Sequence, residues 1–200
     1  MSYIQDITRH LEVLGPLGEG ERSALEHMRA LAKNVVLQKG EDLFTRGDVP
    51  ASVAFVQKGL LRHVVLDSDG NERIVCFHRE GEFVHDCERW AANEPADFAV
   101  IAAEECRLTL FQLAEVHALT DGHPGFDAVG ARMMMGDRSA LMDHVSMLQR
   151  FNPEERYRYL LKHDPELVRR VSVTHLAQYL GLTRETLSRV RARVVEQVIS

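Results

Sequence analysis

The segment SVTHLAQYLGLTRETLSRVRARV, residues 172–194, constrains the fold and function of this chain most strongly. Its apolar residues recur with helical spacing in two runs, Val173, Leu176, Ala177, Leu180 and then Leu182, Leu187, Val190, Val194. Gly181 separates the runs, where a sharply ending helix favours a residue that can adopt positive φ. Ser172 and Thr183 stand before the runs, and their hydroxyls can cap unpaired backbone N–H groups. The segment predicts two helices joined by a tight turn, the layout of a helix-turn-helix.

The outward face of the second predicted helix is basic and carries no large apolar side chain. Its members are Arg184, Glu185, Ser188, Arg189, Arg191 and Arg193. Arginine can donate two hydrogen bonds to a guanine edge, and a carboxylate can accept one from cytosine. This face is typical of a helix that reads DNA in the major groove. A plain structural helix hairpin, common in helical domains, is the alternative.

Charge is segregated along the chain. Residues 152–200 hold nine Lys and Arg against six Asp and Glu, a net +3; the whole chain carries −6, so residues 1–151 carry −9. A basic end on an acidic body favours a polyanionic partner at that end. A merely solvated face would explain the number of charges, but less readily their segregation.

Composition limits the class of protein. With 200 residues, 45% of them hydrophobic, the chain can build a proper core. It has no apolar run of membrane-spanning length and no secretory signal at its start. The three cysteines, Cys76, Cys87 and Cys106, are an odd number without a CxxC pair, which fits a reducing compartment without structural disulfides. We therefore expect a cytoplasmic protein.

The middle of the chain reads as β-structure. Between residues 35 and 111, glycines recur every seven to twelve residues between short apolar segments, which suggests a sandwich or barrel. The expected strands are Val35–Leu37, Leu43–Phe44, Ala54–Val56, Leu60–Leu66, Arg73–Phe77, Phe83–Val84, Phe98–Ala103 and Arg107–Phe111. Asp69-Gly70 predicts a hairpin, because both central turn residues can accept positive φ. A helix over Glu21–Lys33 is expected ahead of the strands.

A short helix over Gln112–Leu119 and a much longer one opened by Pro124 should connect the two parts. The long helix carries one apolar stripe at seven-residue intervals, Met134, Leu141 and Leu148, and another at Phe126, Val129, Met133, Ala140 and Met147. We expect one stripe to face the chain's own β domain and the other the same helix of a second subunit. A single broad face buried within one chain is the alternative. The expected divisions are 1–111, 112–151 and 152–200.

This order of elements resembles the cyclic-AMP receptor protein/FNR family of bacterial transcription regulators over nearly the whole chain. The matching pieces are KGEDLFTRGDVPASVAFVQKGLLR, GNERIVCFHREGEF and LAQYLGLTRETLSRVRARV. The resemblance implies an α+β fold: an N-terminal β-roll, which is a jelly roll like that of cyclic-nucleotide-binding domains, a long dimerisation helix and a C-terminal helix-turn-helix domain. Because the chain ends soon after the second helix, it looks like a compact form with a reduced or absent wing.

The resemblance also implies the function: a homodimeric, sequence-specific regulator rather than an enzyme. Its partners would be RNA polymerase and double-stranded DNA with a palindromic operator, whose half-sites are related to TGTGA. TRETLSR looks like the start of the family's recognition helix, which places base reading on Arg184, Glu185 and Arg189. Thr183, Ser188 and Arg191 complete the expected interface. We assign no catalytic residue.

The expected effector pocket departs from the family pattern within FVHDCERWAANEPADFAV. His85-Asp86 replaces a Gly-Glu pair, and Asp97 stands near where an Arg-Ser pair would grip a cyclic phosphate. A carboxylate repels phosphate, and Arg89 is the one nearby cation. His85, Asp86, Arg89 and Asp97 therefore remain a candidate pocket for an unknown effector, and cyclic AMP is not expected.

Haem or a metal ion remains an open alternative as cofactor. The tripeptides at residues 76–78 (CFH) and 85–87 (HDC) supply suitable donor atoms. An iron–sulfur cluster of the FNR type would need a cysteine near the N-terminus, and the first is Cys76.

A cupin-like, metal-dependent small-molecule enzyme is the alternative function. It would need H-x-H with a following Glu, which His63, His78 and His85 do not provide. We therefore assign no metal ligand from the sequence.

Overall fold

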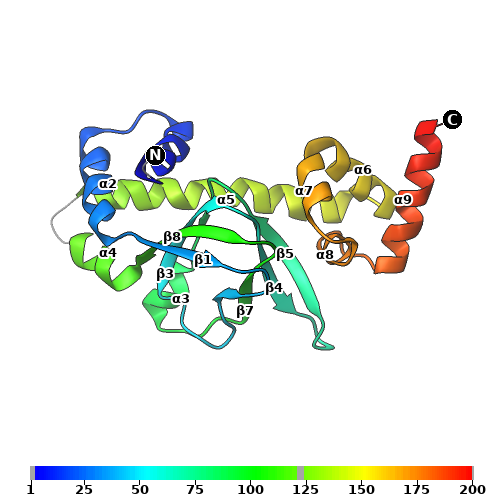
Figure 1. Ribbon diagram of the computed structural model, residues 1–200, viewed down its shortest axis with the longest axis horizontal. Coiled ribbons are helices and arrows are strands. Elements are labelled where there is room, and N and C mark those ends of the chain that lie inside the picture. The colour runs from blue at the N-terminus through cyan, green and yellow to red at the C-terminus, as the bar shows by residue number, and fades with distance from the viewer. Residues whose placement is uncertain (1–2, 121–123, 200) are drawn as a thin grey trace. The chain divides into compact units, whose positions relative to one another are not determined.

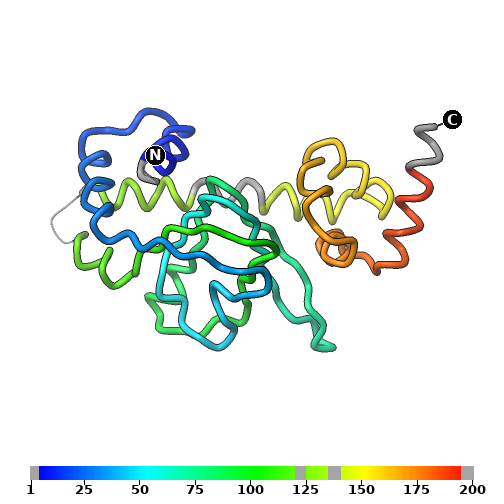
Figure 2. Tube along the Cα trace, viewed as in Figure 1, coloured from blue at the N-terminus to red at the C-terminus, as the bar shows by residue number. Residues whose placement is uncertain are grey.

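The computed structural model describes the backbone of residues 3–120 and 124–199 (Figures 1 and 2). Side chains are described for residues 5–119, 125–134 and 141–194. The chain forms two compact units, residues 1–63 with 77–139, and residues 64–76 with 140–200. The second unit thus takes in the tip of one β-hairpin as well as the C-terminal helices.

Within the described residues, eight strands form two four-stranded sheets, in the orders β1-β8-β3-β6 and β2-β7-β4-β5. The strands are β1 Lys33–Leu37, β2 Asp42–Phe44, β3 Ser52–Lys58, β4 Leu61–Leu66, β5 Glu72–His78, β6 Phe83–Val84, β7 Phe98–Ala102 and β8 Cys106–Gln112. β3 and β8 pair antiparallel, with Val53 opposite Phe111. Each strand expected from the sequence is present, and the predicted α+β class with a β-roll is confirmed.

Apolar side chains of both sheets and of the neighbouring helices form the core of the first unit. β7 is buried along its whole length, and β3 is buried from Ser52 to Val56. The residues Ile7, Leu11, Leu25, Met28, Phe55, Phe83, Phe111, Phe126, Val129 and Met133 belong to one buried cluster. Helices near both ends of this unit's sequence therefore share one core with strands β3, β6 and β8 of one sheet.

The hairpin between β4 and β5 forms as predicted, but its turn is of a different kind. Gly70 has φ 81°, whereas Asp69 is not among the residues with positive φ, so only one of the two residues adopts the conformation that both could accept. The Asp67 carboxylate instead accepts hydrogen bonds from the backbone N–H groups of Asp69 (3.0 Å) and Asn71 (2.9 Å). These bonds hold the pKa of Asp67 low, the Asn71 amide contributing most. A side chain therefore organises a longer turn than the dipeptide suggested.

In the part of the chain that the structure describes, five helices and a short 3₁₀ segment accompany the strands. They are α1 Tyr3–Leu11, η1 Glu12–Leu14, α2 Glu19–Leu31, α3 Cys87–Ala92, α4 Leu113–Thr120 and α5 Pro124–Arg150. In Figure 1, β8 runs directly into α4 beside α2. The Arg132 side chain of α5 pairs with Glu21 and donates to the backbone carbonyl oxygens of Leu11 (3.1 Å) and Gly15 (2.9 Å). These bonds attach α5 to the N-terminal helices.

The two apolar stripes of α5 differ in burial. Phe126, Val129, Met133 and Met147 are buried. By contrast, Met134 is 51% exposed and Leu141 44% exposed, and Met142 and Val145 are exposed beside them. Leu148, expected with the exposed stripe, is partly buried, and the side chain of Ala140 lies outside the described part.

The second unit contains α6 Pro153–His163, α7 Pro165–Arg170, α8 Val173–Tyr179 and α9 Arg184–Ile199. Asn152 caps α6 by accepting from the N–H groups of Glu154 and Glu155. The stretch LLKHDPELVRRVS, residues 160–172, is expected from the sequence to be a linker, but it contains the end of α6 and all of α7. Asp164 caps α7, whose first residue is Pro165.

Among the described residues, no helix combines the length and apolar character needed to cross a bilayer.

Candidate nucleic-acid interface and effector region

The turn between α8 and α9 is built as the sequence predicts. Gly181 has φ 66°, its N–H donates to the Gln178 carbonyl (3.2 Å), and the Leu182 N–H donates to that of Ala177 (2.8 Å). This pair of bonds is the Schellman arrangement, which ends a helix sharply. Leu176, Ala177, Leu180, Leu187 and Val190 are buried between the helices. The predicted helix-turn-helix is therefore present in the second unit.

Arg156 of α6, which sequence analysis did not single out, ties this unit together. Its guanidinium donates to three backbone carbonyl oxygens, those of Phe151, Leu180 and Leu148, each at 2.9 Å. The Leu180 carbonyl lies at the end of α8, where helix carbonyls lack intrahelical partners. An arginine in the sequence does not reveal these acceptors, because they come together only in the folded unit.

His144 of α5 supports α8 in a second way. Its ring stacks on Tyr179, with centroids 3.9 Å apart, and its Nε2 lies 2.8 Å from the Tyr179 carbonyl oxygen. The side chain is buried, and burial is the largest cause that lowers the pKa of His144. Contacts with the Tyr179 and Val75 carbonyls act in the opposite direction, and the Arg156 charge lowers the pKa further.

The predicted reading residues lie on the exposed side of α9 and its entry. Thr183, Arg184, Glu185, Ser188 and Arg189 are exposed, and Arg191 is half-buried. The Thr183 hydroxyl accepts from the Thr186 N–H (3.2 Å), as an N-cap does. The predicted DNA-contacting side chains therefore all lie on α9 or on Thr183, the residue that caps it.

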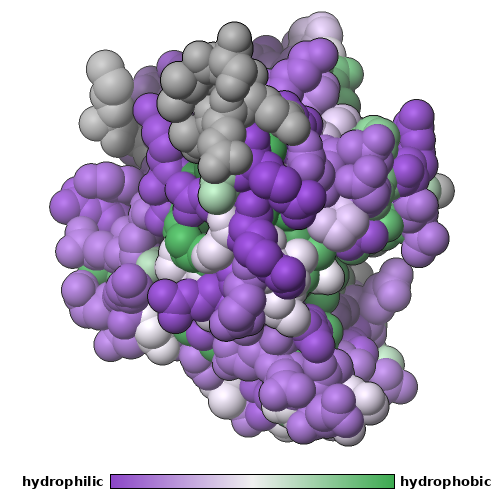
Figure 3. Space-filling view, turned by 90° about the vertical axis from the view of Figure 1, so that its right-hand side faces the viewer, coloured by the Kyte–Doolittle hydropathy of each residue, from purple (hydrophilic) through white to green (hydrophobic). Residues whose placement is uncertain are grey.

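The charges on this surface are only partly compensated. Within the side chains that the structure describes, Arg184, Arg189 and Arg191 form no ion pair, whereas Arg193 lies 3.9 Å from Glu154. Figure 3, which views the molecule from the side of α9, shows a mainly hydrophilic face with small hydrophobic areas. A polar, cationic face suits phosphate and base contacts.

The predicted effector residues form an ion-pair cluster. The Arg89 guanidinium lies 2.7 Å from an Asp97 carboxylate oxygen and 3.3 Å from one of Asp86, and it donates to the Pro95 carbonyl at 2.9 Å. Asp86 also caps α3 through the Arg89 N–H (3.0 Å). The carboxylates of Asp86 and Asp97 therefore already neutralise Arg89, the one cation in this stretch that could bind a phosphate.

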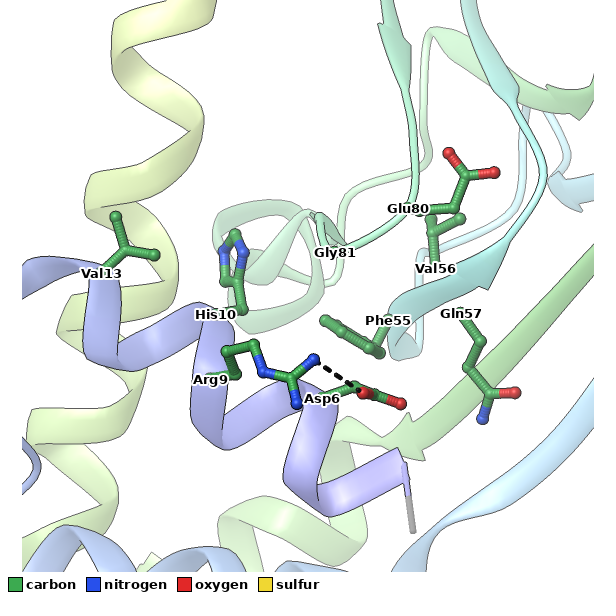
Figure 4. Close-up of a pocket in the computed structure, with 9 residues that line it drawn as sticks. All are labelled: Asp6, Arg9, His10, Val13, Phe55, Val56, Gln57, Glu80 and Gly81. Carbon is green, nitrogen blue, oxygen red and sulfur yellow. Dashed lines mark ion pairs between the residues drawn. The ribbon is translucent and has the colours of Figure 1, made fainter. Parts of the chain in front are cut away.

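A separate pocket of about 340 Å³ lies where α1 and η1 meet β3 (Figure 4). It is lined by Asp6, Arg9, His10, Val13, Phe55, Val56, Gln57, Glu80 and Gly81. Asp6 and Arg9 face each other at 3.8 Å, and His10 meets the edges of Phe55 and Phe83. None of the predicted effector residues lines this pocket, and no sequence signal could have found it, because α1 reaches β3 only through tertiary packing.

Histidines gather on the hairpin of β4 and β5. The rings of His63 and His78 lie 5.9 Å apart, and His63 also packs on Phe98 at 4.4 Å between centroids. Burial, together with the smaller effects of the neighbouring His63 and His85, lowers the pKa of His78 to about 3. The donor atoms of His63, Cys76 and His78 lie within 4.8 Å of one another. The search for an H-x-H pattern missed this group because it joins two strands.

Comparison with known proteins gives consistent relatives. Residues 34–123 match the family described as "Cyclic nucleotide-binding domain". The chain is 26% identical over 188 residues to the fumarate and nitrate reduction regulatory protein of Escherichia coli strain K12, covering 88% of this chain and 74% of that protein. It is 26% identical over 180 residues to the nitrogen fixation regulation protein FixK of Azorhizobium caulinodans, covering 84% and 71%.

Solved structures share the fold. FixK2 from Bradyrhizobium japonicum has a TM-score of 0.66 at 24% identity, covering 84% of this chain and 86% of that one. The c-di-GMP responsive global regulator CLP of Xanthomonas campestris has a TM-score of 0.72 at 19% identity, covering 88% and 92%. A transcriptional regulator of Thermus thermophilus, described as a CRP/FNR family member, has a TM-score of 0.65 at 18% identity, covering 82% and 87%.

Proposed function

We propose that this chain is a DNA-binding transcription regulator of the CRP/FNR family, whose α9 reads an operator. The relatives at 26% identity are named as regulators and span most of the chain. The observation that carries the proposal is the exposed face of α9, where Arg184 and Arg189 are free of ion pairs among the described side chains. Arginines held in this way can fork onto guanine edges.

The interface divides into two kinds of contact. Arg184, Glu185 and Arg189 occupy the first turns of α9, the part of a recognition helix that meets base edges. Arg191 and Arg193 lie further along the helix and suit phosphate contacts, which add affinity without sequence information. Thr183 and Ser188 complete the surface with hydroxyl groups. A cupin-like enzyme would not need a basic, exposed face on α9, so this face does not support the enzyme alternative.

Regulators of this family act as dimers, and we place the dimer contact of this chain on the exposed stripe of α5. Met134, Leu141, Met142 and Val145 expose apolar surface on one helix. A second copy of α5 would cover it, and two-fold symmetry would then present two α9 helices to inverted half-sites about 34 Å apart. Contact with RNA polymerase stays a prediction.

Selection from random double-stranded DNA tests the reading function. We expect the wild type to enrich an inverted repeat with G·C pairs in each half-site, related to TGTGA, and Arg189→Ala to lose preference at one base pair per half-site. Arg29→Ala on α2 removes the same charge far from α9 in sequence and should enrich the wild-type motif. Enrichment of no palindrome by the wild type would show that α9 does not read an operator.

Cyclic AMP is not the effector under this proposal, because Asp86 and Asp97 hold the Arg89 guanidinium. Calorimetry with cyclic AMP and cyclic GMP should give no saturable heat up to about 1 mM, which corresponds to roughly 4 kcal/mol of binding. Micromolar affinity for either nucleotide would contradict this view of the pocket.

A further inference from the structure

We propose that His63, Cys76 and His78 form a binding site for a borderline-soft divalent metal ion, with Zn²⁺ as its best-suited occupant. The three residues come from adjacent strands of one hairpin: His63 from β4, Cys76 and His78 from β5. Residues two apart on a strand point to the same face, so Cys76 and His78 project together. Their donor atoms and that of His63 all lie within 4.8 Å of one another.

The spacing of these atoms suits a shared ion. Zn–N bonds of about 2.0–2.1 Å and Zn–S bonds of about 2.3 Å keep the ligand atoms of a tetrahedral site roughly 3.3–3.8 Å apart. Side-chain shifts of about 1 Å would therefore close the group around an ion. All three residues are partly buried, which leaves access for the ion while limiting competition from water.

The donor set selects the class of metal. Two imidazole nitrogens and one thiolate suit zinc, cobalt and copper, whereas magnesium and calcium prefer oxygen ligands. Three protein ligands leave one tetrahedral position for a water molecule or a further donor. Haem offers at most two axial positions, on opposite faces of its iron, so three converging donors fit an ion better.

The surroundings favour a fixed geometry. His63 packs on Phe98 of β7, and an oxygen of Glu82 lies 3.9 Å from His78 Nδ1. A small movement would bring this carboxylate within hydrogen-bond distance of the ring, where it would orient a ligating histidine and raise its basicity. Asp86 and Asp97 add negative charge near His63, which attracts a cation.

Zinc titration of the full chain, stripped with a chelator, tests the site against a chromogenic competitor. We expect one equivalent of Zn²⁺ per chain with a Kd below about 1 μM. Cys76→Ser, His63→Gln and His78→Gln should each weaken binding by about 100-fold. Cys87→Ser and His27→Gln change the same residue types outside the group, and both should bind as the wild type does.

Cobalt gives a second readout that reports the ligands themselves. Co²⁺ bound at this site should show intense visible bands of a tetrahedral ion and a thiolate-to-metal charge-transfer band. Cys76→Ser should abolish the charge-transfer band, whereas His63→Gln should retain it. Circular dichroism of each metal-free variant establishes that it is folded, and if Cys76→Ser is not, the His63→Gln comparison decides.

Three results would overturn the proposal. The first is the absence of stoichiometric binding by the wild type. The second is equal zinc affinity in the folded His63→Gln, His78→Gln and wild-type proteins. The third is a haem absorption band that depends on Cys76 or His78 in a protein that does not bind zinc. None of these measurements involves DNA, so the site stands or falls independently of the proposed regulator function.

Discussion

Under the proposed function, single side chains would decide which base pairs α9 reads, and Arg189 gives the sharpest test. It is exposed on the second turn of the helix, where its guanidinium lies 3.4 Å from the Thr186 hydroxyl and carries no carboxylate partner among the described side chains. A hydrogen bond of this length is weak and does not neutralise the guanidinium, so a base edge could replace the Thr186 hydroxyl at little cost in free energy.

Replacing Arg189 by Ala should cost about 1–3 kcal/mol of operator binding, because a bidentate contact with guanine is lost. Titration of the selected operator and of a scrambled one by fluorescence anisotropy measures the loss. Arg193→Ala is the comparison: it should weaken binding to both sequences alike and flatten the salt dependence. If Arg189→Ala loses the same binding free energy on both sequences, Arg189 contacts phosphates rather than bases.

His144 makes the stability of the second unit depend on pH. Burial lowers its folded-state pKa below the ordinary value of 6.5, and the groups that face it are Arg156, Tyr179 and the Val75 carbonyl. The unfolded chain therefore binds a proton more readily, so the stabilisation is complete above about pH 6.5 and is lost as pH falls below it. The slope contributed by one group is at most about 1.4 kcal/mol per pH unit.

Urea unfolding between pH 7.5 and 5, followed by tyrosine signals of the second unit, checks this effect. His144→Gln should flatten the pH dependence, because the amide can donate to the Tyr179 carbonyl without titrating. The exposed His163, replaced in the same way, controls for the loss of one histidine. An unchanged pH slope in His144→Gln would assign the acid sensitivity to other groups.

At the scale of elements, the crossing of α2 and α5 depends on two glycines in contact. A Cβ added to Gly125 would lie 2.1 Å from the Gly20 carbonyl oxygen and 2.4 Å from its carbon, so the backbones would have to separate. Gly130, five residues further along α5, has open space around the same position. Gly125 and Gly130 cannot be told apart by sequence, but only Gly125 is needed for the close approach of the two helix backbones.

Gly125→Ala should destabilise the first unit by about 1–3 kcal/mol through overpacking. Gly130→Ala should stabilise the protein by up to about 1 kcal/mol, because alanine loses less backbone entropy in a helix interior. Denaturant melts of the two variants beside the wild type measure both shifts. If both variants move in the same direction, the close approach of Gly20 and Gly125 is not a packing contact.

At the scale of the whole molecule, the exposed stripe of α5 sets the expected assembly. Met134→Glu combined with Leu141→Glu should convert a dimer into monomers, because it places two carboxylates in the seam. Sedimentation at micromolar concentration measures the change, and circular dichroism should show an intact fold. Val36→Glu with Leu66→Glu introduces the same charges at exposed apolar sites outside the α5 stripe and should leave the dimer unchanged. If the wild-type protein sediments as a monomer, the exposed stripe of α5 is not a dimer contact.

Local sequence signals determined most of the elements of this protein. Glycine positions, apolar spacing and capping hydroxyls placed the strands, the long helix and the helix-turn-helix, because each of these signals acts between residues a few positions apart. The basic face of α9 could be predicted for the same reason: helical spacing alone puts Arg184, Ser188 and Arg189 near one another. The turn after Asp67 shows the limit, since a side-chain hydrogen bond displaced the turn that the dipeptide favoured.

Only the tertiary structure decided which groups from distant segments meet. The fold pairs the Arg89 guanidinium with the carboxylates of Asp86 and Asp97, and it brings three backbone carbonyls within hydrogen-bond distance of Arg156. It also brings the donor atoms of His63, Cys76 and His78 together from two neighbouring strands. It also divided the apolar residues of α5 into buried and exposed ones. The sequence carries the residue types, but long-range contacts depend on register and packing, which no local pattern encodes. That is why α9 could be recognised before the structure, whereas the histidine and cysteine group could not.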